Sequence, residues 1–193
     1  LDLRDAPRGE PLPIYLPRRQ PLPNTEIFAG HLLEQSRRLI LGRSGLTGVL
    51  VDASCMRQRL CSELAAEFGS RVTLESTAPE SNGVICCSWS WWLSHQHLLP
   101  EPEQLIAAML PIASLEDPLT AARVESLKRQ GRDWFRTLLL PEALAILIPA
   151  IASLRRSGGR LAILDGRVRG RSWGEQVLRA LEPWDSLQRL RPD

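Results

Sequence analysis

The amino-acid sequence predicts an α/β fold, with a mostly parallel sheet that carries helices on both faces. Its 193 residues suit one domain with a substantial core. Short apolar runs alternate with helix-period patterns, and the clearest runs are centred on Val49, Ile85, Ile106 and Ile163. Because these runs are apolar at successive positions, both faces of each strand are expected to be buried, which is typical of parallel sheets. We therefore expect about five to seven strands, with these four at the centre.

The order of the remaining elements follows from helix periodicity and from turn residues. Residues 1–23 are rich in proline and aperiodic, and we interpret them as an extended segment that leads into a domain at 24–193. Helical spacing, N-capping residues and terminal glycines predict helices at 25–41, 55–68, 119–130, 134–139, 141–156 and 172–181. Short runs bounded by turn residues predict strands at 49–52, 71–75, 83–87, 104–110 and 160–165, and an edge strand at 187–190.

The positive charge of the chain is concentrated near its C-terminus. Residues 155–193 contain nine arginines and five acidic residues, whereas residues 25–154 have more acidic than basic residues. The formal net charge of the whole chain is +2, and Lys128 is the single lysine. Arginine suits bidentate contact with phosphates, although a GC-rich coding sequence would produce the same bias. The C-terminal third is therefore the part of the sequence best suited to a polyanion.

The four cysteines favour a reducing compartment. Cys55, Cys61, Cys86 and Cys87 have neither the spacing of a metal site nor a dense disulfide pattern. Thiols in a helix or in an apolar strand usually belong to the core. We expect a cytoplasmic protein without a metal site.

Two segments bear on targeting and on membranes. The chain opens with Leu1, and residues 1–20 carry charges and prolines without an apolar core, so we expect a piece of a longer polypeptide and no signal peptide here. Residues 138–154 are the most apolar stretch, but they are too short for an untilted span and contain Glu142. They predict a buried helix, and we expect no membrane partner.

The segment Gly-Arg-Val-Arg-Gly-Arg-Ser at 166–172 lies between a predicted strand and a predicted helix, as a phosphate-binding loop does. It is one residue shorter than that loop, and Arg171 stands where the lysine of the loop would contact phosphates. Two interpretations remain, a nucleotide-binding loop and a basic turn. The two departures favour the basic turn.

A cluster of three tryptophans and two histidines follows the second central strand. Trp89, Trp91 and Trp92 would suit stacking on nucleobases, but aromatic side chains beside a buried strand more often belong to the core or to a domain interface. His95 and His97 are candidate metal ligands, although no third ligand is apparent, and the flanking residues indicate a partly buried loop.

Four stretches of sequence occur in the order and at the spacing of one family. They are Gly-Val-Leu-Val-Asp at 48–52 with Met-Arg-Gln-Arg-Leu at 56–60, Ala-Ala-Met-Leu-Pro-Ile at 107–112 with the helix at 117–127, Leu-Pro-Glu-Ala at 140–143, and Leu-Ala-Ile-Leu-Asp-Gly-Arg at 161–167 with Trp-Gly at 173–174. Together they resemble the second, C-terminal motor domain of DinG/XPD-type superfamily 2 DNA helicases. The resemblance implies a RecA-like fold of the P-loop NTPase class for the domain at 24–193.

The resemblance also reveals departures from the motifs that this family uses with ATP. Motif VI reads Gln-x-x-Gly-Arg-x-x-Arg, and its register here falls on Pro149, Ala152, Ser153 and Arg156. Ser153 thus replaces the arginine expected at the γ-phosphate, which leaves Arg156 and Arg155 as candidate catalytic arginines. The Gly-x-Asp of motif V is also missing. Because an arginine finger contributes about 10³–10⁵ in turnover, we expect degenerate catalysis.

In this family the chain would be part of an ATP-dependent DNA helicase, contributing nucleic-acid binding and one wall of the ATP site. ATP and Mg²⁺ would bind the N-terminal RecA-like domain of the same parent chain, which is the expected partner. We expect no cofactor in this chain and no ATP hydrolysis by it alone. Arg167, Arg169 and Arg171 are the expected contacts with single-stranded DNA. The alternative is a non-catalytic module that binds nucleic acid or protein and retains the helicase fold.

Overall fold

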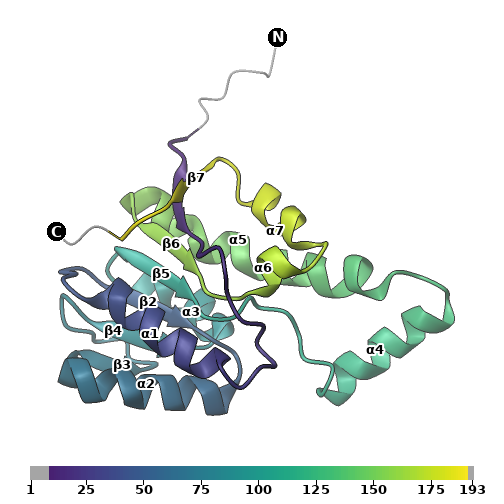
Figure 1. Ribbon diagram of the computed structural model, residues 1–193, viewed down its shortest axis with the longest axis horizontal. Coiled ribbons are helices and arrows are strands. Elements are labelled where there is room, and N and C mark those ends of the chain that lie inside the picture. Colours follow the sequence, from purple (N-terminus) through teal and green to yellow (C-terminus); the bar gives the residue numbers. More distant parts are fainter. Residues whose placement is uncertain (1–8, 191–193) are drawn as a thin grey trace, which may run out of the picture.

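The computed structural model describes residues 9–190, and its centre is a seven-stranded sheet (Figure 1). The strands are β1 (Leu12–Tyr15), β2 (Thr47–Leu50), β3 (Val72–Leu74), β4 (Val84–Cys87), β5 (Gln104–Ala107), β6 (Arg160–Ile163) and β7 (Trp184–Leu187). Their order is β3-β4-β2-β5-β6-β1-β7, and every neighbouring pair is parallel. The predicted parallel sheet is confirmed, and the four strands predicted at its centre are adjacent to one another.

Helices cover both faces of the sheet, as predicted (Figure 1). They are α1 (Phe28–Ile40), α2 (Ser54–Phe68), α3 (Trp89–His95), α4 (Pro118–Arg129), α5 (Leu140–Ser157), α6 (Arg167–Gly170) and α7 (Gly174–Ala180), with the 3₁₀ turns η1 (Gly69–Arg71) and η2 (Gln96–Leu98) and the π-helical turn η3 (Phe135–Leu139). α1 and α2 pack on one face, while α3, α5 and α7 pack on the other.

Successive residues of β2 show how the sequence fills these two layers. Val49 belongs to the core under α1 and α2, where Leu64 packs. Leu50 belongs to the core under α3 and α5, where Trp92 packs. All four side chains are fully buried. The continuous apolar run is therefore explained by helices on both sides, since neighbouring residues of a strand point to opposite faces.

The strand β1 lies inside the Pro-rich segment and was not predicted. It is placed between β6 and β7 and pairs in parallel with both, for example through Ile14 with Leu161 of β6. Pro13 interrupts the apolar pattern of this short strand, and proline in a run normally argues against an internal strand. Leu12 and Ile14 are nevertheless fully buried, so packing under α5 and α7 decides the structure here.

Other differences concern short elements. The region of tryptophans and histidines forms α3 and η2, whereas the sequence indicated a loop. The basic segment at 166–172 contains the single turn α6. The edge strand is β7, about three residues earlier than predicted, and its partly exposed side chains explain its weak sequence signal.

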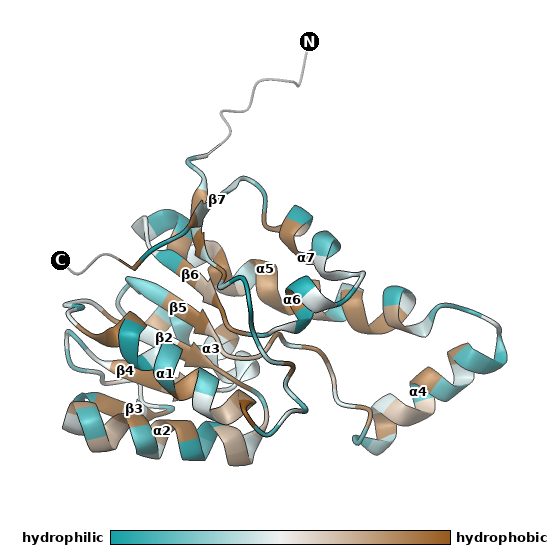
Figure 2. Cartoon of the chain, viewed as in Figure 1, coloured by the Kyte–Doolittle hydropathy of each residue, from teal (hydrophilic) through white to brown (hydrophobic). Residues whose placement is uncertain are grey.

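The apolar segment Phe135–Ser157, formed by η3 and α5, is long and apolar enough to cross a membrane by length and composition alone. One face of α5 belongs to the core, where Leu147, Ile151 and Leu154 are buried. The buried helix predicted at this position is thus present. Figure 2 shows apolar residues concentrated on the strands and on the inner faces of the helices.

Candidate nucleic-acid interface at the carboxyl edge of the sheet

The carboxyl ends of the parallel strands lie along one edge of the sheet, where α/β proteins usually place their binding sites. β6 ends just before Asp165, β5 leads to Leu110, and β1 leads into residues 17–22. This edge brings together segments that are more than a hundred residues apart in the sequence.

Asp165 and Arg167 form a buried ion pair at this edge. The Asp165 carboxylate is completely buried and accepts hydrogen bonds from the amide N–H groups of Leu110 (2.9 Å) and Arg167 (3.0 Å). The Arg167 guanidinium also donates to it, with Nη2 2.6 Å from Oδ2. Only 21% of the Arg167 side chain is exposed. The charge of Arg167 is therefore largely compensated within the fold, and its first role is to hold the turn between β6 and α6.

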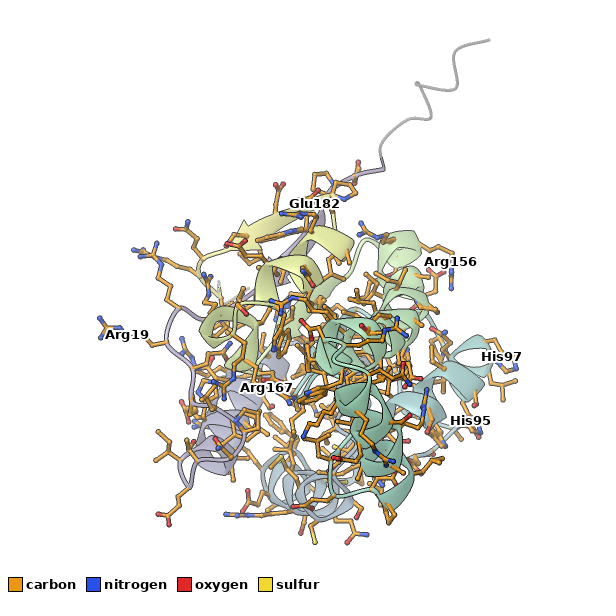
Figure 3. All side chains as sticks on the ribbon, turned by 90° about the vertical axis from the view of Figure 1, so that its right-hand side faces the viewer. Arg19, His95, His97, Arg156, Arg167 and Glu182 are labelled. Carbon is orange, nitrogen blue, oxygen red and sulfur yellow. The ribbon has the colours of Figure 1, made fainter. Side chains whose placement is uncertain are left out.

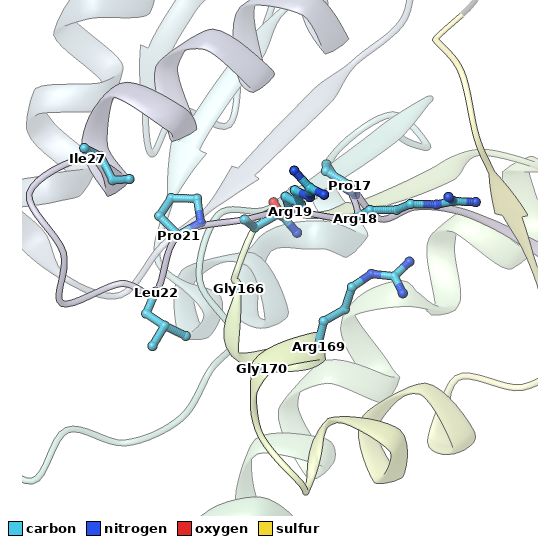
Figure 4. A pocket seen from close by; sticks show the side chains of 10 residues that line it. Pro17, Arg18, Arg19, Pro21, Leu22, Ile27, Gly166, Arg169 and Gly170 are labelled. Atoms are coloured by element: carbon cyan, nitrogen blue, oxygen red, sulfur yellow. The ribbon is translucent and has the colours of Figure 1, made fainter.

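A groove of about 630 Å³ lies beside this turn, between residues 17–22 and α6. Figure 4 shows Arg18, Arg19 and Arg169 at one end of the groove, with Leu22 and Ile27 at the other. Arg18, Arg19 and Arg169 are exposed, and among the described residues no ion pair involves them. The groove therefore combines a cationic end with an apolar end.

Residues 17–22 are fixed mainly by contacts of Gln20 and Gly166, and Arg169 donates to the carbonyl oxygen of Leu16 just before them (3.3 Å). The side-chain amide of Gln20 donates to the carbonyl oxygen of Ile163 in β6 (2.9 Å), and its oxygen lies 2.7 Å from Nε2 of His31 in α1. Burial lowers the pKa of His31. Gly166 approaches this segment so closely that an added Cβ would lie 2.7 Å from the Gln20 carbonyl oxygen. The backbone of the groove is thus set by α1, β6 and a glycine.

The segment at 166–172 does not form an anion-binding loop. The amide of Arg167 donates to the Asp165 side chain, that of Val168 to the Asp165 carbonyl, and that of Gly170 to the Gly166 carbonyl. These N–H groups are used inside the fold and do not converge on an empty cradle. The geometry favours the basic turn over the nucleotide-binding loop.

The candidate catalytic arginines lie elsewhere. Arg155 donates to the carbonyl oxygens of Leu181 (2.5 Å) and Pro183 (3.1 Å), and Arg156 pairs with Glu101 at 3.5 Å. Both are at the end of α5 that leads into β6, and therefore at the amino edge of the sheet. Figure 3 shows Arg156 well separated from Arg167 and Arg19. The structure does not bring the two predicted groups of arginines together.

Ser153, at the position of the expected arginine finger, is 3% exposed. Its hydroxyl donates to the carbonyl oxygen of Ala150 (3.4 Å), which also accepts from the indole N–H of Trp92 (3.4 Å). Ser157, one turn further along α5, donates to Pro102 before β5. Ser153 therefore lies near α3, and Ser157 contacts the segment that leads into β5.

The tryptophans and histidines lie in α3 and η2, which pack beside this part of α5. Trp89 and Trp92 are buried, and the indole N–H of Trp89 donates to the Met109 carbonyl oxygen (2.9 Å). The ring of Trp91 is half-buried and stacks on the His95 imidazole, with 4.4 Å between ring centroids. Within residues 9–190, no group of three or more His, Cys, Asp or Glu side chains is arranged to hold a metal ion.

A second polar cluster lies at the carboxyl ends of β2, β3 and β4. Asp52 accepts from the amide of Trp89 (2.9 Å), and Glu75 accepts from the amide of Ser88 (3.2 Å). Arg57 lies 3.9 Å from Glu75, which has a φ of 50°. These contacts fix the start of α3, so we interpret the cluster as structural support for the edge.

Sequence reasoning predicted Arg167, Arg169 and Arg171 as nucleic-acid contacts and did not single out Arg18 and Arg19, which line the groove. Arg169 and Arg171 are exposed at the edge, as a binding role requires, whereas Arg167 is held by Asp165. The adjacent arginines after Tyr15 were visible in the sequence, but β1 had to be recognised before they could be placed beside α6.

Comparison with known proteins gives the chain a set of distant relatives, although no family model matches it. It is 26% identical over 179 residues to the ATP-dependent DNA helicase YoaA of Escherichia coli, and 29% identical over 121 residues to YoaA of Haemophilus influenzae. It is 32% identical over 117 residues to DinG of Bacillus subtilis, which is named a 3′-5′ exonuclease. The chain is a distant relative of DinG-type helicases.

These relatives are much longer than the region they share with this chain. The alignments cover 86%, 61% and 58% of the chain, but only 28%, 19% and 13% of the E. coli, H. influenzae and B. subtilis proteins. The relationship therefore concerns one part of each DinG-type protein.

Proposed function

We propose that this chain is the C-terminal, RecA-like motor domain of a DinG-type helicase and that it binds the phosphate backbone of single-stranded DNA. The observation that carries the proposal is the groove at the carboxyl edge, where Arg18, Arg19 and Arg169 face solvent without acidic partners among the described residues. Arginine guanidinium groups are well suited to phosphate oxygens. Arg171, exposed just beyond α6, extends the same charge.

The apolar end of the groove suits the sugar or the base of a nucleotide. Leu22 and Ile27 line it, and 70% of Ile27 is exposed. A strand whose phosphates contact the arginines could place a sugar or a base against these side chains without sequence-specific hydrogen bonds. We therefore propose binding that depends on the backbone and tolerates any sequence.

Fluorescence anisotropy with a labelled oligonucleotide tests this proposal. We expect weak binding, with a Kd of about 10⁻⁴–10⁻⁶ M at physiological salt. Replacing Arg18, Arg19 and Arg169 by Gln should weaken binding at least about tenfold and reduce the salt dependence by about 0.7 log units per lost contact for each tenfold change in salt.

The matched control replaces Arg37, Arg38 and Arg59 on α1 and α2, which removes the same charge from another surface. This control variant should bind almost as tightly as the original chain. If both triple variants bind equally well, or if binding ignores salt, the groove is not a phosphate site.

A non-catalytic role is the second candidate function, and the surroundings of Ser153 favour it. The expected finger position is buried, Arg155 is tied to backbone carbonyls, and Arg156 pairs with Glu101. In this role the domain would keep its nucleic-acid groove while contributing little to ATP turnover. Nucleic-acid-stimulated ATP hydrolysis by the full-length parent distinguishes the two roles, because only a working motor shows it.

A further inference from the structure

The helix α4 stands apart from the layered body of the protein (Figure 1). It projects on the side of the carboxyl edge and returns through η3 into α5. Its inner side is held by the burial of Val124, which is 3% exposed, and by an ion pair between Arg123 and Glu142 of α5. At its end, the Lys128 ammonium lies 5.5 Å from the centre of the Trp134 ring. We call α4 and the turn after it, residues 118–134, the arm.

The far end of the arm is basic and faces solvent. Lys128, Arg129 and Arg132 are exposed there, and within the described chain none of them forms an ion pair. Asp133 directly follows Arg132 in the sequence, but it is already paired with Arg136 (3.2 Å). Figure 2 shows this end of α4 as hydrophilic. Three cations therefore project from a thin element that buries little against the body.

A hydrogen bond connects the root of the arm to the segment beside the groove. Arg136, which follows the arm, donates to the Ser172 hydroxyl (3.0 Å). Ser172 is next to the exposed Arg171, and Arg171 is two residues from Arg169 in the groove. Arg169 and Arg171 thus lead from the groove, past the end of α6, to Arg136 at the root of the arm.

We propose that the arm is a second contact for the nucleic-acid backbone, which binds the strand where it leaves the groove. This inference rests on the proposed function of the groove. A polyanion with regularly spaced charges matches cations that lie both in the groove and at the end of a projecting element. The twelve residues of α4 span about 18 Å, which corresponds to about five nucleotides at the roughly 3.4 Å spacing of a B-form strand and to fewer for an extended single strand. A strand that only fills the groove should not reach the end of the arm.

The dependence of affinity on oligonucleotide length tests the inference. An arm variant carrying Lys128→Gln, Arg129→Gln and Arg132→Gln is compared with the original chain by fluorescence anisotropy at low salt. Labelled oligothymidylates of about 6 and about 18 nucleotides are used, chosen from the span of the arm. We expect unchanged affinity for the short strand and about tenfold weaker binding of the long strand. The salt dependence for the long strand should fall by about 2 log units per tenfold change in salt.

Two comparisons make the result decisive. The groove variant with Arg18, Arg19 and Arg169 replaced by Gln should lose affinity for both lengths, and a control with Arg38, Arg59 and Arg179 replaced by Gln should lose little for either. Circular dichroism melting verifies that each variant remains folded. An arm variant that binds the long strand normally, or that loses both lengths equally, overturns the role of the arm. Unchanged binding by the groove variant overturns the proposed function instead, so the two failures are distinguishable.

An acidic peptide provides the remaining comparison. A labelled poly-glutamate peptide carries the negative charge of a nucleic acid without its backbone. If the arm contacts nucleic acid, this peptide should bind at least about tenfold more weakly than the long strand at the same salt, and the arm variant should not change its affinity. Equal affinity that the arm variant abolishes would assign the arm to an acidic protein partner and overturn the inference.

Discussion

Replacing Asp165 by Ala should destabilise the fold by about 3–5 kcal/mol. The carboxylate is completely buried and accepts from two backbone amides and from the Arg167 side chain, so its removal leaves the amides of Leu110 and Arg167 without acceptors. Each unsatisfied buried donor costs about 1–3 kcal/mol, and breaking a buried ion pair costs about 3–5 kcal/mol. The two estimates agree.

Arg167→Ala should cost less, about 2 kcal/mol, because the carboxylate keeps its two amide donors and the lost side chain is 21% exposed. Domains of this kind have about 5–15 kcal/mol of total stability, so both variants should still fold. Urea denaturation followed by circular dichroism measures the two free energies of unfolding. A loss of unfolding free energy below about 1 kcal/mol for Asp165→Ala would refute the reasoning, because two buried amides without acceptors should cost more than that.

Two further predictions concern Ser153 and His31. Ser153→Arg should not restore a finger but should destabilise the fold by about 3–5 kcal/mol. The site is 3% exposed, and among the described residues no buried carboxylate is placed to pair with a guanidinium there. Urea denaturation measures this loss, and an unchanged midpoint would contradict the prediction. Burial lowers the pKa of His31, so the unfolded chain binds a proton more readily, and stability should be complete above about pH 6.5 and decline as the pH falls toward the folded-state pKa. His31→Gln should remove this component, and identical pH profiles for the two proteins, measured by urea denaturation at several pH values, would exclude it.

The centre of the fold could be predicted from sequence because its signals are redundant. Ile85 and Ile106 lie in runs that are apolar on both faces, and helical patterns separate them, so local and global preferences agree. β1 could not be predicted from the same signals. Its four residues include Pro13, and only the neighbouring strands β6 and β7 give the segment partners for its backbone.

The candidate site depends on β1, the strand that was not predicted, because β1 places Arg18 and Arg19 beside Arg169. The arginines themselves could be read from the sequence. Arg169 was identified from the basic C-terminal third, whereas Arg18 and Arg19 follow β1 and meet Arg169 only because β1 is inserted beside β6. The sequence also could not reveal that Asp165 takes up the charge of Arg167, since that contact depends on the turn after β6. The composition therefore indicates which part of the chain is basic, whereas the topology determines which arginines stay exposed and unpaired with acidic residues at the carboxyl edge.

The residues at the positions expected for motif VI fit one another physically. Pro149 has no N–H to donate to the carbonyl oxygen of Ala145 one turn earlier in α5. The carbonyl oxygen of Pro149 itself accepts from the Gln96 side chain (3.4 Å). The next carbonyl, that of Ala150, accepts from both Trp92 and Ser153. A small side chain at 153 lets α3 and η2 cover this face of α5, and a bulky tryptophan fills the space beside Gly48, where an added Cβ would lie 3.1 Å from the Trp92 ring. This packing is at the end of α5 near the amino edge, so it leaves the groove at the carboxyl edge intact. The proposed nucleic-acid binding and the proposed loss of the arginine finger are therefore compatible within one fold.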